Sequence, residues 1–183
     1  MNESARSDLL QSLKFLSKRG DFTLASGKKS DWYLDCRPAM ASTHTLRIAA
    51  ESLVEAARGY SLPVLGGPAT AAVAVMAAAL TFGERTPTQF IYTRAKTKDH
   101  GTTQAVEGPK LGPDAQVLLV DDVLTSGGSL LKCADAIKAV YPDVTIVGAW
   151  VLVDREEGGR ENLMEHGIAV TSLFTRTDIA PKA

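Results

Sequence analysis

The sequence predicts an α/β fold with a doubly wound, mostly parallel sheet and a small N-terminal flap. Strand-like and helix-like segments alternate from residue 43 onward, which is typical of a parallel sheet with crossover helices. Several strand-like runs are apolar at every position, as expected for strands that are covered on both faces. A length of 183 residues suits one hydrophobic core, so we expect a single domain over residues 1–183.

Residues 1–40 do not join this alternation. Leucines recur on one helical face near the N-terminus, and the predicted helix begins at Ser7, as its N-cap, and ends at Gly20, as its C-cap. Two strand-like runs, FTLA and WYLDC, follow on either side of the polar turn SGKKSD. We expect this segment to form a helix and a flap over the C-terminal edge of the sheet.

The rest of the chain divides into two halves around a long polar segment. The first half contains a helix at 43–58, a strand at 63–67, an alanine-rich helix at 70–82 and a strand at 89–93. The second half contains the strand QVLLVDD, a helix with Leu130, Ala134 and Ile137 on one face, the strand TIVGAWVLVD, a helix at 161–166 and the strand AVTSLF. Residues 94–114 between them are polar and rich in glycine, and a loop of this length in a compact domain is usually functional or disordered.

Composition argues against several classes of function. Twenty basic and 21 acidic residues leave a net charge of −1, which does not suit a general nucleic-acid or membrane-surface binder. The two cysteines, Cys36 and Cys133, are far apart and have no His or Cys nearby, so a zinc site is set aside. The N-terminus is not a signal peptide, and the apolar run at 69–80 is too short to cross a bilayer. We therefore expect a cytoplasmic protein with reduced thiols.

The strongest functional signal is the segment VLLVDDVLTSGGS at 117–129. A buried strand delivers Asp121 and Asp122 at its C-terminal end, where open α/β sheets bind their ligands. The following hydroxyl residues and glycines open a helix, and such a turn aims backbone N–H groups at a phosphate. Carboxylates beside phosphate donors suit a ribose 5-phosphate, and the two carboxylates also suit a hydrated magnesium ion.

Other motifs and a purely structural turn fit this segment less well. A Walker A loop needs lysine after its second glycine, whereas Gly128 is followed by Ser129. The G-x-G-x-x-G fingerprint of dinucleotide-binding domains is absent from the sequence. A receiver domain carries its paired acids early in the chain, but here they follow residue 120. Two aspartates that only capped a strand would repel each other without a partner.

The segment resembles the phosphoribosyl pyrophosphate (PRPP) motif of type I phosphoribosyltransferases, and the rest of the chain narrows the resemblance to the orotate phosphoribosyltransferase family. FTLASGKKSDWYLD resembles the N-terminal flap of that family, and GGPATAAVAV resembles its pyrophosphate-side loop. RAKTKDHGTTQAVEG resembles its mobile catalytic loop, and VLVDREEGGRENLMEHGI resembles the strand and loop that contact the base. The flap and the base-contacting segment are not general to type I enzymes, so they carry the specificity.

The resemblance implies a magnesium-dependent pentosyltransferase that moves the phosphoribosyl group of PRPP to orotate, giving orotidine 5′-monophosphate and pyrophosphate in pyrimidine (UMP) biosynthesis. It implies that Asp121 and Asp122 hold the ribose hydroxyls, directly or through metal-bound water, and act in catalysis with Lys98 and His100. The implied PRPP site comprises Arg94, Lys96, Lys98, His100, Asp121, Asp122, Val123, Leu124, Thr125, Ser126, Gly127, Gly128 and Ser129. The implied orotate site comprises Thr125 and Arg155. Residues of the mobile loop at 94–114 are expected to reach the partner's site in a homodimer.

The residue types suit this chemistry. Negative charge grows on the departing pyrophosphate, and cationic side chains and magnesium stabilise that charge as it develops. A histidine such as His100 is able to hydrogen-bond to, or protonate, the leaving oxygen. A closing loop keeps water away from the ribosyl cation. The guanidinium of Arg155 is expected to bind the orotate carboxylate bidentately.

Three alanines depart from the family pattern. Ala25, Ala71 and Ala95 stand where many members of the family carry lysine, and their presence removes positive charge from the pyrophosphate side. Two alternatives therefore stay open: a phosphoribosyltransferase for another base, such as a purine or uracil, and a non-catalytic sensor of PRPP or nucleotides. Replacing Arg155 with alanine should weaken binding of a carboxylated base but not of an uncarboxylated one, which tests the first alternative. Binding of PRPP without release of pyrophosphate would favour the second.

Overall fold

The computed structural model describes residues 3–23, 27, 29–61, 63–81, 87, 89–94 and 105–180. These residues form a six-stranded sheet in the order β5-β4-β3-β6-β7-β8. Its strands are β3 (Val64–Pro68), β4 (Phe90–Thr93), β5 (Val106–Glu107), β6 (Gln116–Leu124), β7 (Thr145–Asp154) and β8 (Val170–Thr175). Neighbouring strands are parallel except β4 and β5, which are antiparallel. The predicted mostly parallel α/β sheet is confirmed.

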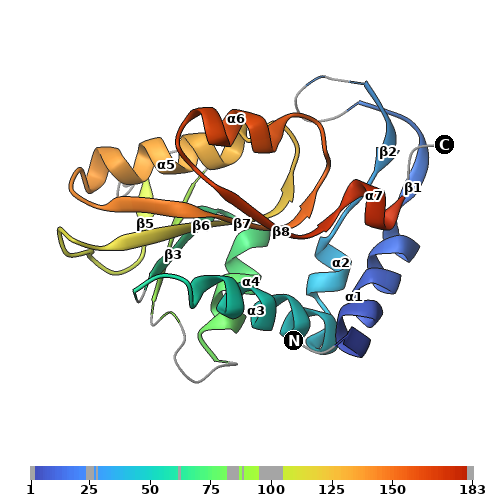
Figure 1. Ribbon diagram of the computed structural model, residues 1–183, viewed down its shortest axis with the longest axis horizontal. Helices are drawn as coiled ribbons and strands as arrows, with labels where there is room; N and C mark the ends of the chain where they lie inside the picture. The colour runs from blue at the N-terminus through green and yellow to red at the C-terminus, as the bar shows by residue number, and fades with distance from the viewer. Residues whose placement is uncertain are drawn as a thin grey trace, which may run out of the picture.

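Helices cover both faces of this sheet (Figure 1). One face carries α5 (Gly128–Val140) and α6 (Gly159–Glu165), and the other carries α3 (Thr43–Ala57) and α4 (Ala71–Ala79). Along β6, Leu118 and Val120 join the core on the α3 and α4 side, whereas Val117 and Leu119 join the core on the α5 side. Successive side chains of a strand point to opposite faces, so a run that is apolar at every position requires this double cover.

The N-terminal segment forms a separate flank. It contains α1 (Glu3–Leu16), the antiparallel strands β1 (Lys18–Thr23) and β2 (Lys29–Tyr33), and α2 (Arg37–Met40). Figure 1 shows β1 and β2 beside α7 (Arg176–Ile179), near the end of the main sheet. Residues of β2, near the start of the chain, therefore lie beside residues of α7, near its end.

The predicted limits of the first helix are wrong. It begins at Glu3 and not at Ser7, and it ends at Leu16, so Gly20 lies within β1 and caps nothing. The helix buries Leu9 and Leu13, and after it Lys18 pairs with Tyr33 across the two-stranded sheet. Strand pairing with a later segment therefore outweighs the local capping signals, which is a common reason for misplaced helix ends.

The polar segment at 94–114 is not entirely irregular. Its residues Val106 and Glu107 form β5, which extends the sheet beyond β4, while residues 95–104 lie outside the described residues. The adjacent Gly108 has φ 128°, and a Cβ there would lie 2.8 Å from the carbonyl oxygen of Phe90. Two-residue strands give no periodic pattern, so the sequence could not predict β5; the four-residue helices α2 and α7 were missed for the same reason.

The topology brings four chain segments to one edge of the sheet. Because β3, β4, β6 and β7 are parallel, the segments that follow them all leave from the same side. The register places Pro68 beside Thr93 and Leu124 beside Asp154. The acidic strand β6 lies between β3 and β7, so the residues after β6 are flanked on both sides. In the described part of the chain, no helix has the length and apolar character needed to cross a membrane.

Candidate active site

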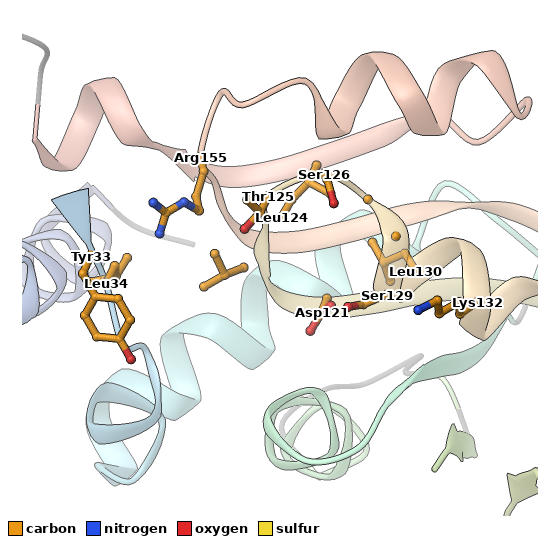
Figure 2. A pocket seen from close by; sticks show the side chains of 13 residues that line it. Tyr33, Leu34, Asp121, Leu124, Thr125, Ser126, Ser129, Leu130, Lys132 and Arg155 are labelled. Atoms are coloured by element: carbon orange, nitrogen blue, oxygen red, sulfur yellow. The ribbon is translucent and has the colours of Figure 1, made fainter. Parts of the chain in front are cut away.

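A cavity of about 470 Å³ lies at the C-terminal ends of β6 and β7 (Figure 2). Its wall combines the turn after β6, the start of α5, two residues from the end of β2 and one arginine that follows β7. The lining residues are Tyr33, Leu34, Asp121, Val123, Leu124, Thr125, Ser126, Gly127, Gly128, Ser129, Leu130, Lys132 and Arg155. The cavity thus unites the predicted phosphate turn with Asp121 and Arg155.

The turn after β6 presents backbone donors to this cavity. Gly127 precedes α5 with φ 80°, a left-handed conformation that favours glycine. A Cβ at this position would lie 3.1 Å from the carbonyl oxygen of Gly159 and 3.2 Å from Leu163 Cγ. Glycine has no side chain to cap the helix, so the first N–H groups of α5 remain available to an anion. The predicted phosphate turn therefore has the backbone geometry that such a role requires.

Helix α6 supports the turn from behind. Asn162 donates a hydrogen bond from Nδ2 to the carbonyl oxygen of Ser126 at 2.7 Å. A Cβ on Gly159 would lie only 2.5 Å from the carbonyl oxygen of Thr125. Sequence reasoning did not single out Asn162, because its contact spans 36 positions and leaves no local pattern.

Replacement of Gly159 by alanine is expected to displace this turn. The new methyl group would collide with the backbone of Thr125, and we expect the affinity for ribose 5-phosphate to fall about tenfold as hydrogen bonds to the phosphate are lost. Isothermal titration calorimetry measures the change. Gly112→Ala is the matched control, because a Cβ there has nothing within 4 Å. Equal affinities in the two variants would show that the close packing of α6 does not set the turn.

The two aspartates differ in position. Asp121 lines the cavity and is 9% exposed, whereas Asp122 is not among the lining residues. The backbone N–H of Asp122 donates to Asp121 Oδ1 at 2.9 Å, and that of Val123 donates to Asp122 Oδ1 at 2.9 Å. Burial, followed by the adjacent charge of Asp122, raises the pKa of Asp121 well above its usual range. Side chains alternate along a strand, so Asp122 lies on the same face as Val120, which packs on the α3 and α4 side.

This carboxylate pair suits a magnesium ion. Carboxylate oxygens are hard ligands, and a cation beside Asp121 would offset the burial and repulsion that now disfavour its charge. Among the described residues, no group of three or more His, Cys, Asp or Glu side chains is arranged to hold a metal. Magnesium held here would therefore take its remaining ligands from substrate oxygens and water, as this ion commonly does.

Arg155 is a buried residue whose surroundings come from distant parts of the chain. Its side chain is 3% exposed, and its backbone N–H donates to the carbonyl oxygen of Leu124 at 2.9 Å. Nε donates to Glu157 Oε1 at 3.0 Å. Nη2 donates to Ser30 Oγ at 3.0 Å and to the carbonyl oxygen of Trp32 at 2.9 Å. The guanidinium carbon also lies 4.8 Å from the centroid of the Trp32 ring.

These contacts leave one nitrogen of Arg155 for a ligand. Among the described residues, Nη1 has no hydrogen-bond partner, and Figure 2 shows the Arg155 side chain between Leu34 on one side and Thr125 on the other. The expected bidentate contact with a carboxylate is therefore not available in this arrangement. A buried guanidinium must satisfy its other N–H groups with protein acceptors, so contact with a carboxylate is expected through Nη1 alone.

The remaining predicted residues lie away from this cavity or outside the described part. Arg94 follows β4, and its Nε lies 3.3 Å from Glu107 Oε1. It is not among the cavity-lining residues, because β3 separates its strand from β6. Lys96, Lys98, His100, Ala25 and Ala95 lie outside the described residues, as does the side chain of Ala71.

Four cavity residues were not predicted. Tyr33 and Leu34 reach the cavity from the end of β2 and the position after it, and Leu130 and Lys132 reach it from the N-terminal part of α5. Lys132 is three positions after Ser129, a spacing that places both on one helical face, and this signal was available in the sequence. No such local signal connects Tyr33 and Leu34 with the turn after β6, because only tertiary packing brings them together.

This chain is similar to known proteins in both sequence and fold. Residues 39–170 match the phosphoribosyl transferase domain family. The orotate phosphoribosyltransferase of Pyrococcus abyssi is 37% identical over 164 residues, which cover 88% of this chain and 87% of the relative. That of Methanopyrus kandleri is 36% identical over 182 residues, which cover 98% and 92% of the two chains.

Solved structures agree with these matches. The orotate phosphoribosyltransferase of Mycobacterium tuberculosis H37Rv, in complex with PRPP, superposes with a TM-score of 0.77 and 26% identity. The superposition covers 96% of this chain and 98% of that one. The match therefore includes the flap and the segment after β7 as well as the central motif, and the chain belongs to the orotate phosphoribosyltransferase family of the phosphoribosyl transferases.

Proposed function

We propose that this protein transfers the phosphoribosyl group of PRPP to orotate, giving orotidine 5′-monophosphate and pyrophosphate. One observation carries the proposal: a single cavity is lined by the turn that opens α5 and by Arg155, whose Nη1 has no hydrogen-bond partner among the described residues. A phosphate on the sugar and a carboxylate on the base would place a negative charge beside each of these two groups of hydrogen-bond donors. The family relationship supports the same reaction, which belongs to pyrimidine biosynthesis.

The order of strands suits a displacement at the anomeric carbon. The turn from Thr125 to Ser129 would hold the 5′-phosphate, and Asp121 and Asp122 would hold the ribose hydroxyls beside β6. Arg155, after β7, would hold orotate with Thr125. The segments after β3 and β4, including Arg94, lie on the other side of β6 and would face the pyrophosphate. Orotate would then approach the anomeric carbon from one side while pyrophosphate departs from the other, as a displacement requires.

Magnesium and the loop after β4 complete the proposal. Magnesium held at Asp121 and Asp122, in part through water, would neutralise charge on the ribose and pyrophosphate oxygens. Lys96, Lys98 and His100 would contact the pyrophosphate, with Lys98 and His100 acting on the leaving oxygen. A homodimer would supply these loop residues to the partner's site, as the family resemblance implies. Two buried, unpaired cysteines suit the reducing cytoplasm, where we propose that the enzyme works.

A spectrophotometric assay of orotate consumption tests this proposal. With PRPP and magnesium, the wild-type protein is expected to consume orotate and release one pyrophosphate for each orotate used. Asp122→Asn should slow turnover without abolishing folding, since this side chain is only half-buried. Turnover of a purine or of uracil, with orotate left untouched, would instead identify a different base. PRPP binding without any pyrophosphate release would identify a sensor.

A further inference from the structure

Two arginines lie over one buried indole ring beside the cavity. The guanidinium carbon of Arg155 is 4.8 Å from the centroid of the Trp32 ring, and that of Arg176 is 5.5 Å from the same centroid. Trp32 is 1% exposed and Arg176 is 7% exposed. Arg176 does not line the cavity, so any effect that it has on a ligand must pass through its neighbours.

Trp32 contacts Arg155 through both its backbone and its ring. Its carbonyl oxygen accepts from Arg155 Nη2, and Ser30 Oγ donates to the same carbonyl at 2.8 Å. Ser30 Oγ also accepts from Arg155 Nη2, so the strand β2 and the guanidinium are joined at several points. The direction of Nη1 therefore depends on where β2 holds the indole ring and the Trp32 carbonyl.

Arg176 holds this part of β2 from the other end of the chain. Its Nη2 lies 2.7 Å from Asp31 Oδ1, across 145 positions of sequence. The helix that contains Arg176 is in turn tied to the residue after Arg155: Glu156 Oε2 accepts from the backbone N–H of Thr177 at 2.8 Å and from its hydroxyl at 2.6 Å. The C-terminal helix α7 thus contacts both β2 and the loop that contains Arg155.

Burial of the Arg176 and Trp32 side chains carries a free-energy cost. Arg176 Nε and Trp32 Nε1 are buried and have no hydrogen-bond partner among the described residues. An unpaired buried donor destabilises the fold, so structural stability alone does not explain why both groups are kept here. The ion pair with Asp31 offsets little of this cost, because the Asp31 side chain is 74% exposed to solvent.

We propose that Arg176 is a positioning residue for base recognition, acting through Trp32 to direct Arg155 Nη1 at the carboxylate of the base. This inference rests on the proposed function and assigns a role to a residue outside the cavity. Stacking of Arg176 on the indole holds Trp32 against the guanidinium of Arg155. Without Arg176, β2 loses one of its contacts with α7, and Arg155 loses a fixed orientation. Binding of PRPP at the turn after β6 does not depend on this contact.

Steady-state kinetics of Arg176→Ala tests the inference. The KM for orotate is expected to rise about tenfold, as for loss of a coupled contact, while the KM for PRPP changes less than about twofold. In an Arg155→Ala background, Arg176→Ala should have no further effect on the KM for orotate. Arg58→Ala is the matched control, because Arg58 makes a surface ion pair with Glu55 on α3. If Arg176→Ala fails to fold, Arg176→Gln is used in its place, because glutamine keeps most of the length of the arginine side chain.

Three results would overturn the inference: equal rises in both KM values, an unchanged KM for orotate, or the same added effect when Arg155 is already absent. The proposed function fails separately, if the wild-type protein does not turn over orotate at all. In that case calorimetric binding of orotate to wild type and Arg176→Ala still decides the role of Arg176. Equal binding by the two proteins, including no binding by either, would then count against it.

Discussion

Asp121→Asn is expected to stabilise the ligand-free protein while removing most of its activity. The wild-type carboxylate is buried beside Asp122, and both effects raise its pKa because they disfavour its charge. Asparagine keeps the shape and carries no charge, so we expect the free energy of unfolding at neutral pH to increase by about 0.5–2 kcal/mol. Turnover should fall about 100-fold, since the group that we propose to position the ribose is lost. Urea denaturation and the orotate assay measure the two effects.

The gain in stability is expected to depend on pH. The raised pKa means that the folded protein holds a proton on Asp121 at pH values where the unfolded chain has lost it. As pH rises from the ordinary pKa of aspartate through the raised pKa of Asp121, the free energy of unfolding of the wild-type protein therefore falls relative to that of Asp121→Asn. It stays lower at neutral pH.

Other carboxylates do not obscure this comparison. Hydrogen bonds from Arg176 and Arg37 lower the pKa values of Asp31 and Asp35, so these groups favour folding more as pH rises. Their contribution is common to both proteins and cancels in the difference. A difference in unfolding free energy that stays constant from acidic to neutral pH would contradict the raised pKa of Asp121.

Arg155→Ala is expected to cause the largest loss of base affinity. Removing a charge-assisted hydrogen bond to a carboxylate should cost about 2–3 kcal/mol. That cost corresponds to a rise of roughly 30- to 150-fold in the dissociation constant for orotate. Calorimetry with orotate measures this change directly. The KM for PRPP should change little, because the turn after β6 does not depend on the guanidinium.

Uracil provides the control for this variant, because it lacks the carboxylate. We expect Arg155→Ala and the wild-type protein to bind uracil with the same affinity. An equal loss of orotate and uracil affinity would mean that Arg155 acts by holding β2 in place and not by contacting the base. A thermal melt is needed beside the binding data, since the variant leaves Glu157 and the Trp32 carbonyl without their buried partner.

Two of the three alanines, Ala71 and Ala95, belong to the segments that follow β3 and β4, which we propose to face the pyrophosphate. Ala71 begins α4, on the β3 side of the sheet, and Ala95 follows Arg94 after β4. Among the described residues, those that line the cavity come from the flap, β6, α5 and the segment after β7, and none comes from the segments after β3 and β4. Loss of lysine at these positions is therefore expected to affect the departure of pyrophosphate more than the recognition of phosphate or base.

Much of the fold and the phosphate turn could be predicted from the sequence because their signals are local. In β6, the unbroken apolar run at 117–120 predicted a strand covered on both faces, and two opposite cores confirm it. Gly127 and Gly128 follow the end of the strand within four positions, so a turn that opens a helix could be recognised locally. Local signals failed where pairing with a later segment decided the outcome, as at Ser7 and Gly20.

The environment of Arg155 was decided only by the tertiary structure. The sequence shows that an arginine follows a buried strand, but nothing near Arg155 in the chain indicated that its side chain is buried or which acceptors its Nε and Nη2 contact. Its partners Ser30 and Trp32 are 125 and 123 positions away, and Arg176 meets Asp31 across 145 positions. Contacts of such separation leave no periodicity or motif in the chain. They arise because the parallel strands end at one edge of the sheet, where the N-terminal flank packs against Arg155 and the C-terminal helix packs against that flank.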